Sequence, residues 1–228
     1  MHRSVYTTIL RILKAMHIFD VDHTITRRST GRQYVATAIR MGVIPRRVLF
    51  SLLNVSIRYK FGRLSSSQIN RDLPEVEGVS KDRLMEVAAR AFEERIKEDV
   101  FPKALEFIRN LKNDGEEVAI ATSSIDIIVK PLTEYLGISR VIASSMEFED
   151  GLCTGRFINT PAFNSQKRDK MLKILESEGI PPKSCSFYSD SIYDLPLMEA
   201  VGEPVATNPD ILLARHAKRM SWRVLDFS

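Results

Sequence analysis

The chain has 228 residues, 44% of them hydrophobic, with a net charge of +4 and two cysteines. This length allows one sizeable core and a small accessory domain. Two cysteines do not indicate a disulfide framework, so Cys153 and Cys185 are predicted to be buried apolar residues.

Residues 1–15 are predicted to form a short amphipathic helix that leads into the first strand. Arg11 and Lys14 interrupt its apolar run, which is too short for a signal peptide. No segment reaches the roughly 18 consecutive apolar residues that a membrane-spanning helix needs. A cytoplasmic location is therefore the expectation.

The apolar run Met16–Phe19 is the first predicted strand. Two carboxylates, Asp20 and Asp22, stand at its end, one residue apart.

Residues 23–71 carry ten Arg or Lys and no Asp or Glu. Such a one-sign block indicates either an anionic partner (an acidic substrate, a membrane surface or nucleic acid) or simply a solvated basic helix face. Both interpretations remain open. No nucleic acid partner is expected, because the block lacks interleaved stacking aromatics and any recognisable nucleic-acid-binding module.

Helical periodicity dominates from Arg28 to Asp99, which we interpret as a helical insertion after the first strand. Residues 48–57 are ambiguous between strand and helix. The longer stretch 44–64 places a ten-residue apolar core between flanking Arg and Lys residues. It is either a buried helix of the insertion or an interfacial helix near anionic lipid, and the second alternative makes the protein peripheral to a membrane.

The remainder alternates strands with helices, which predicts an α/β fold with a mostly parallel sheet covered on both faces. Helices are predicted to end at Gly115, Gly137 and Gly179, with Pro131 either kinking the second of them or falling early in it. Asp150-Gly151 predicts a β-hairpin within residues 146–157. The further predicted strands are Glu117–Ala121, Arg140–Ala143, Ser184–Tyr188, Pro204–Thr207 and, as a weaker candidate, Trp222–Leu225.

Ligands of open parallel sheets bind at the carboxyl ends of the strands, so the polar residues after each strand are the candidate site. Period-two alternation puts Asp20 and Asp22 on one side of the strand end. Clustered carboxylates repel, and a hard cation such as Mg²⁺ relieves the repulsion. The residues that follow the strands are Asp20, Asp22 and Thr24; Thr122, Ser123 and Ser124; and Ser189, Asp190, Ser191 and Asp194.

The order of these residues resembles the four motifs of the haloacid dehalogenase superfamily. The motifs are Asp20-Val-Asp22-His-Thr24, then Thr122 after a strand, then Lys167, then "YSDSIYDLP" with Asp190 and Asp194. The sequence is most similar to subfamily IB, the phosphoserine-phosphatase-like branch. The resemblance implies a three-layer α/β sandwich with a Rossmann-like sheet, made of residues 1–27 and 100–228, and a helical-bundle cap over residues 28–99.

The resemblance also implies a Mg²⁺-dependent phosphomonoester hydrolase that acts through an aspartyl-phosphate. Its substrate would be a small or lipid-like phosphate monoester. Asp20 would be the nucleophile, and Asp22 the general acid and then the general base. The resemblance implies that the metal is bound by the Asp20 carboxylate, the Asp22 backbone carbonyl and Asp190. The phosphate would be bound by Thr122, Ser123 and Lys167. Asp194 would support the metal site and Lys167.

Asp22 favours phosphate chemistry, because dehalogenases that resemble this chain elsewhere lack the second Asp. Two positions depart from the family pattern. His23 stands where relatives often carry Gly or Asn, and we interpret it as a tolerated loop residue. Ser29 stands where phosphoserine-specific members carry a Glu, which argues against phosphoserine. A phosphotransferase or mutase using the same intermediate, and a non-catalytic binding protein on the same fold, remain as alternatives.

Overall fold

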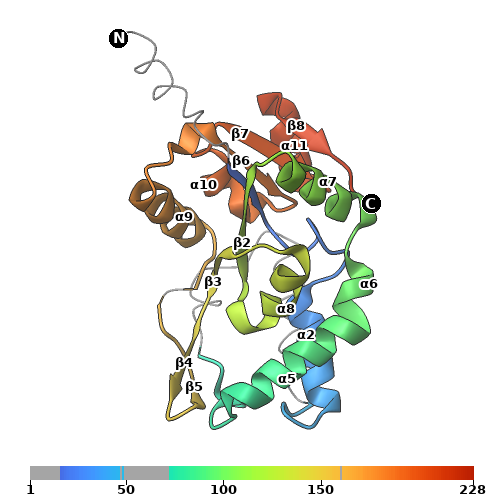
Figure 1. The fold of residues 1–228 in the computed structure, drawn as a ribbon, viewed down its shortest axis with the longest axis vertical. Helices are drawn as coiled ribbons and strands as arrows, with labels where there is room; N and C mark the ends of the chain where they lie inside the picture. Colours follow the sequence, from blue (N-terminus) through green and yellow to red (C-terminus); the bar gives the residue numbers. More distant parts are fainter. Residues whose placement is uncertain (1–15, 47, 49–71, 160) are drawn as a thin grey trace, which may run out of the picture.

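The computed structural model describes residues 16–46, 48, 72–159 and 161–228. Six strands form one sheet in the order β3-β2-β1-β6-β7-β8, and every pairing in it is parallel (Figure 1). The strands are β1 (Met16–Phe19), β2 (Glu117–Ile125), β3 (Arg140–Ser144), β6 (Cys185–Ser189), β7 (Glu203–Thr207) and β8 (Arg223–Leu225).

All six predicted strands are present, including the weaker candidate at Trp222–Leu225. Five of them agree with the structure to within one residue at each end. The exception is β2, which was expected to end at Ala121 but runs to Ile125, with a register shift against β3 between these two residues. The predicted hairpin is also confirmed, as strands β4 (Met146–Glu149) and β5 (Leu152–Phe157).

The sheet is the middle of three layers, as strand periodicity dictates. In β1, Phe19 packs on one face and Met16 and Ile18 on the other. Helices α7 (Pro102–Asn113) and α8 (Asp126–Leu136) cover the Phe19 face. The opposite face is covered by α9 (Ser165–Ser177), α10 (Leu195–Met198) and α11 (Ile211–Met220).

Helix α8 ends as predicted, with Gly137 in the left-handed conformation at φ 64°. The predicted extent of this helix is confirmed, and Pro131 lies inside it rather than in its first turn.

The inserted segment contributes helices that build a separate apolar cluster. Helices α2 (Thr30–Arg40) and α5 (Lys81–Ala91) pack against each other and against α8 (Figure 1). Short elements complete the described part of the segment: η1 (Pro74–Val76), η2 (Phe92–Ile96, a π-helix) and α6 (Lys97–Asp99). The division at residues 28 and 99 stays a prediction, and the predictions for residues 1–15 and 49–64 lie outside the described residues.

Two chain segments connect this insertion to the sheet, and they run side by side. Thr26 forms an antiparallel bridge with Val100, and the Phe101 N–H donates to the Ile25 carbonyl at 2.9 Å. Arg28 makes a bidentate ion pair with the buried Asp99, at 2.7 and 2.8 Å. Charge-assisted bonds of this geometry are among the stronger ones in proteins.

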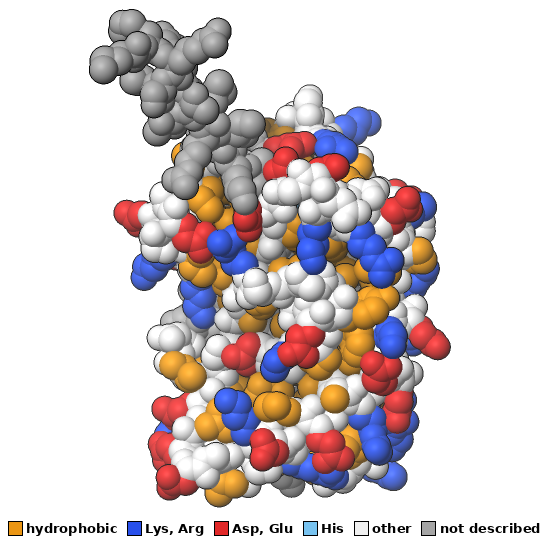
Figure 2. Space-filling view, viewed as in Figure 1, with side chains coloured by type: hydrophobic (Ala, Val, Ile, Leu, Met, Phe, Trp, Pro, Cys, Tyr) orange, Lys and Arg blue, Asp and Glu red, His pale blue; other side chains and the backbone are white. Residues whose placement is uncertain are grey.

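The basic block is partly neutralised in space. Arg28 pairs with Asp99 and Arg40 with Glu94, so acidic residues from the end of the insertion face basic residues from its start. On the face drawn in Figure 2, Lys and Arg side chains intermingle with Asp and Glu. In the part of the chain that the structure describes, no helix has the length and apolar character required to cross a bilayer.

Candidate active site

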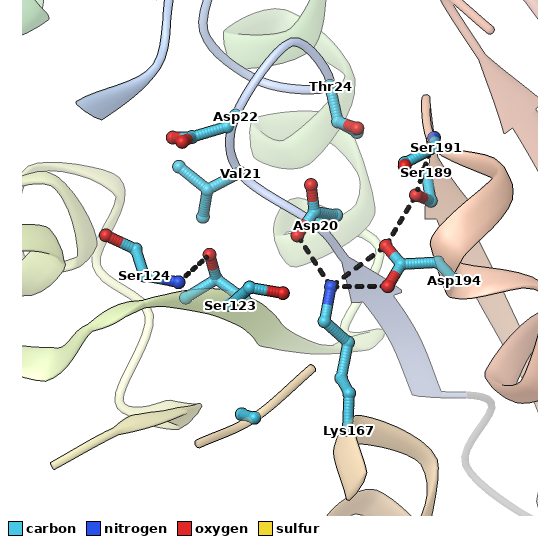
Figure 3. Close-up of polar contacts among 12 residues, drawn as sticks. Asp20, Val21, Asp22, Thr24, Ser123, Ser124, Lys167, Ser189, Ser191 and Asp194 are labelled. Atoms are coloured by element: carbon cyan, nitrogen blue, oxygen red, sulfur yellow. Dashed lines mark hydrogen bonds and ion pairs between the residues drawn. The ribbon is translucent and has the colours of Figure 1, made fainter. Parts of the chain in front are cut away.

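A buried lysine between two carboxylates lies at the carboxyl end of the sheet. Lys167, in the first turn of α9, donates to Asp20 Oδ1 at 3.0 Å and lies 2.7 Å from Asp194 Oδ1 and 2.9 Å from Asp194 Oδ2 (Figure 3). All three residues are at most 6% exposed. Asp20 directly follows β1, and its N–H donates to the carbonyl of Tyr188 on β6 at 2.9 Å. The sheet therefore fixes the Asp20 backbone between two strands.

Burial raises the pKa of the Asp20 carboxyl to about 7. Lys167 opposes that rise, while Asp194 and Asp22 add to it. Burial would lower the pKa of Lys167, but Asp194 and Asp20 outweigh this effect and raise it. Lys167 is therefore a fixed positive charge, and it is shared between two carboxylates.

A third buried carboxylate, Asp190, follows β6. Its backbone N–H donates to Thr24 Oγ1 at 3.0 Å, and Thr24 Oγ1 lies 3.5 Å from Asp190 Oδ1. Burial, and then the neighbouring Asp20 and Asp194, raise the pKa of Asp190 well above its ordinary range. Asp190 and Asp20 are thus buried acids whose ionisation is opposed by burial and by neighbouring carboxylates, and Lys167 offsets part of this effect at Asp20.

Asp194 is held in place by residues at the end of β6. The Ser189 hydroxyl donates to Asp194 Oδ2 at 2.7 Å, and the Ser191 N–H donates to the Ser189 hydroxyl at 3.2 Å (Figure 3). The Asp194 carboxylate therefore accepts bonds from both Ser189 and Lys167, which fixes the lysine beside Asp20.

Asp22 is not part of the contact between Asp20, Lys167 and Asp194. Strand β1 ends at Phe19, and in Figure 3 no dashed line joins the Asp22 carboxylate to that group. The N–H groups of Thr24, Ile25 and Thr26 all donate to the Val21 carbonyl, so the chain turns tightly after Asp22. That Asp20 and Asp22 share one side of the strand end stays a prediction, and the charge of Asp22 acts on Asp20 by raising the pKa of its carboxyl.

The hydroxyl cluster lies near the end of β2 rather than after it. Thr122 is buried, and its Oγ1 accepts a hydrogen bond from the Ser124 N–H at 3.2 Å. Ser123 is exposed, and its carbonyl lies 3.5 Å from the Ser144 hydroxyl. β1 and β2 are adjacent, so these hydroxyl groups and Asp20 belong to neighbouring strands at the same end of the sheet.

Two supporting residues after β7 escaped the sequence interpretation. Asp210 accepts from the Ile192 N–H at 3.0 Å, and its own N–H donates to the Asp190 carbonyl at 2.7 Å. Asn208 donates to the His23 carbonyl at 3.0 Å. Both follow a strand of the same sheet, so the rule that selected Asp190 selects them as well once β7 is included.

The donor set suits Mg²⁺ better than a metal held by protein ligands alone. Three carboxylates are buried here, those of Asp20, Asp190 and Asp194, and Lys167, the one buried Lys or Arg among the described residues, contacts Asp20 and Asp194. No group of three His, Cys, Asp or Glu among these residues is arranged to hold a metal. Mg²⁺ commonly takes one or two carboxylates and fills its other positions with water and substrate phosphate.

Residues 18–199 match the family of haloacid dehalogenase-like hydrolases, and the chain belongs to that family. Among its relatives is a histidinol-phosphatase from Neisseria meningitidis, 29% identical over 221 residues, which cover 94% of this chain and 100% of the relative.

Solved structures agree with this assignment. A Bordetella pertussis protein of unknown function has a TM-score of 0.85 at 26% identity, covering 94% of this chain and 99% of that one. A phosphoserine phosphatase with an analogue of its phospho-aspartyl intermediate has a TM-score of 0.67 at 19% identity, covering 94% of each chain. This second likeness shows the fold alone, and the fold is the one that the motifs predicted.

Proposed function

We propose that this protein is a Mg²⁺-dependent phosphomonoester hydrolase that forms an aspartyl-phosphate on Asp20. The observation that supports it best is the buried Lys167, which donates to both Asp20 and Asp194. A cation fixed beside a nucleophilic carboxylate can neutralise the charge of an incoming phosphoryl group. Membership of a hydrolase family and similarity to a relative named a histidinol-phosphatase support the same reaction.

In the first half-reaction, an Asp20 carboxylate oxygen attacks phosphorus and the bond from phosphorus to the leaving oxygen breaks. Asp22, protonated at this stage, gives its proton to that oxygen, so an alcohol departs. We propose that Thr122, Ser123 and Lys167 hold the phosphoryl oxygens, and that Asp194 keeps Lys167 oriented.

In the second half-reaction, water attacks phosphorus and gives a proton to the Asp22 carboxylate. The bond between phosphorus and the Asp20 oxygen breaks, which releases inorganic phosphate and restores both carboxyl groups. The Asp20 and Asp190 carboxylates and the Asp22 carbonyl would hold Mg²⁺. When bound, the ion supplies positive charge that offsets these carboxylates and the phosphoryl oxygens.

The substrate class that we propose is a small phosphate monoester received under a cap formed by residues 28–99. Ser29 argues against phosphoserine, because it replaces the expected Glu and instead caps α2, its hydroxyl accepting from the Arg32 N–H at 3.5 Å. Histidinol phosphate is the first compound to try, since the relative of that name aligns over its full length.

The test is phosphate release from a panel of monoesters with and without Mg²⁺. The panel contains histidinol phosphate, phosphoserine, a lysophosphatidate and p-nitrophenyl phosphate. Wild type is expected to hydrolyse at least one compound only with Mg²⁺, and Asp20→Asn should reduce kcat by about 10³-fold or more. A variant as active as wild type would exclude Asp20 as the nucleophile. Transfer of phosphate to an added alcohol in preference to water would favour the phosphotransferase alternative.

A further inference from the structure

The Asp22 carboxylate is held by one residue through two hydrogen bonds. Thr30 donates to Asp22 Oδ1 from its backbone N–H at 2.9 Å and from its hydroxyl at 2.7 Å. Thr30 is completely buried. Asp22 is therefore fixed by a residue outside the strand-end motifs.

Local structure explains why Thr30 is available for this contact. Thr30 is the first residue of α2, and Ser29 is the N-cap. The first N–H groups of a helix have no acceptor within the helix. Asp22 satisfies one of them, and a carboxylate at a helix start is also favoured by the helix dipole. The position of α2 and the orientation of Asp22 are thus linked.

Thr30 also approaches the segment that carries the proposed phosphate-binding residues. Its hydroxyl lies 3.4 Å from the Ser124 hydroxyl, and the Ser124 N–H donates to Thr122 Oγ1. The Thr30 hydroxyl has one proton, and the shorter contact, to Asp22, is the one that uses it. The Ser124 hydroxyl is then the donor in the longer contact.

We propose that Thr30 is the positioning residue for Asp22, so that the placement of α2 determines whether Asp22 reaches the leaving oxygen. This inference rests on the proposed function. Its consequence is specific to proton transfer: a loose Asp22 impairs protonation of the leaving group, whereas Lys167, Asp20 and Asp190 are held by other contacts.

Leaving-group dependence separates this role from a general structural one. The kcat/KM value covers the steps up to departure of the leaving group. An alkyl phosphate needs a proton from Asp22 at that point, whereas p-nitrophenolate leaves without one. The decisive measurement is kcat/KM on both types of ester.

Thr30→Val keeps the β-branched shape and the backbone N–H but removes the hydroxyl. It is expected to lower kcat/KM by about 10- to 100-fold on the best alkyl phosphate of the panel. The fold loss on p-nitrophenyl phosphate should be smaller than this by a factor of at least about ten. Thr30→Ser restores the hydroxyl and should recover most of the alkyl activity. Asp22→Asn should show the same bias, more strongly.

Thr37→Val is the matched control. Thr37 lies two turns further along α2, is fully buried, and its hydroxyl has no hydrogen-bond partner among the described residues. Its removal should leave the ratio of alkyl to aryl kcat/KM as in wild type.

Equal losses on the two esters for Thr30→Val, or no loss at all, would overturn the positioning role. If the valine variant does not fold, Thr30→Ala is judged by the same ratio. A wild-type enzyme that cleaves neither ester would instead refute the proposed function, and this inference with it.

Discussion

His23 shows how a backbone requirement can look like a chemical one. It follows Asp22 directly and adopts φ 61°, in the left-handed region that favours Gly and Asn. Its ring Nδ1 lies 2.9 Å from the Arg27 carbonyl, so the side chain bonds locally. The Gly or Asn that relatives often carry here has a conformational explanation, which agrees with the interpretation of His23 as a tolerated loop residue.

Substitutions at His23 should therefore follow backbone preference. His23→Asn is expected to retain the wild-type melting temperature and kcat/KM. His23→Val should lower the free energy of unfolding by about 1–2 kcal/mol, because a β-branched residue is strained in the left-handed region. Thermal unfolding and phosphate release measure the two effects. A loss of activity beyond tenfold in a stable His23→Asn variant would mean that the imidazole takes part in the reaction.

At the scale of the elements, Asp99 links the two chain segments that connect the insertion to the sheet. Its carboxylate accepts from Arg28 at 2.7 and 2.8 Å and from the buried Gln33 at 2.9 Å. Gln33 belongs to α2, so Asp99 ties the second connection to the helix that holds Asp22. In Gln33, the Oε1 atom is already without a partner among the described residues.

Asp99→Ala should lower the free energy of unfolding by about 2–3 kcal/mol, measured by denaturant unfolding. The reason is that Gln33 would lose its acceptor inside the protein, whereas the largely exposed Arg28 can be hydrated. Asp99→Asn keeps an acceptor of the same shape and should fall between wild type and Asp99→Ala. Equal stability of wild type and the alanine variant would show that the carboxylate contributes no net stabilisation.

Local sequence patterns were enough to predict the helices and strands, whereas the contacts between these elements could be identified only from the structure. The apolar run "MHIF" and the glycine after α8 predicted β1 and a helix end correctly. The basic block looked uncompensated, because the partners of Arg28 and Arg40 lie more than 50 residues away in sequence. Thr30 escaped notice for a similar reason. Its role depends on where α2 begins relative to a tight turn, and no spacing rule encodes that relation.

For the whole molecule, the carboxyl end of the sheet concentrates negative charge at a cost in stability. Burial raises the pKa of Asp20 to about 7 and that of Asp190 well above its ordinary range. Between about pH 4 and pH 7 the folded protein therefore holds protons that the unfolded chain has released. Folding is favoured at the acidic end of this window, and stability without metal falls as pH rises through it.

Mg²⁺ should reverse that dependence, because it replaces protons on the same carboxylates. A saturating concentration of Mg²⁺ is expected to raise the melting temperature by several degrees at pH 8 and by much less at pH 5.

Asp190→Asn removes one buried charge, so without metal at pH 8 it should be about 1 kcal/mol more stable than wild type. The variant should also show a smaller pH slope and a weaker response to Mg²⁺. The difference between the two proteins reports Asp190 together with its electrostatic effect on the neighbouring Asp20. Identical slopes of stability against pH in wild type and Asp190→Asn would mean that Asp190 does not cause the loss of stability at high pH. An equal Mg²⁺ effect on the melting temperature at both pH values would place metal binding away from these carboxylates.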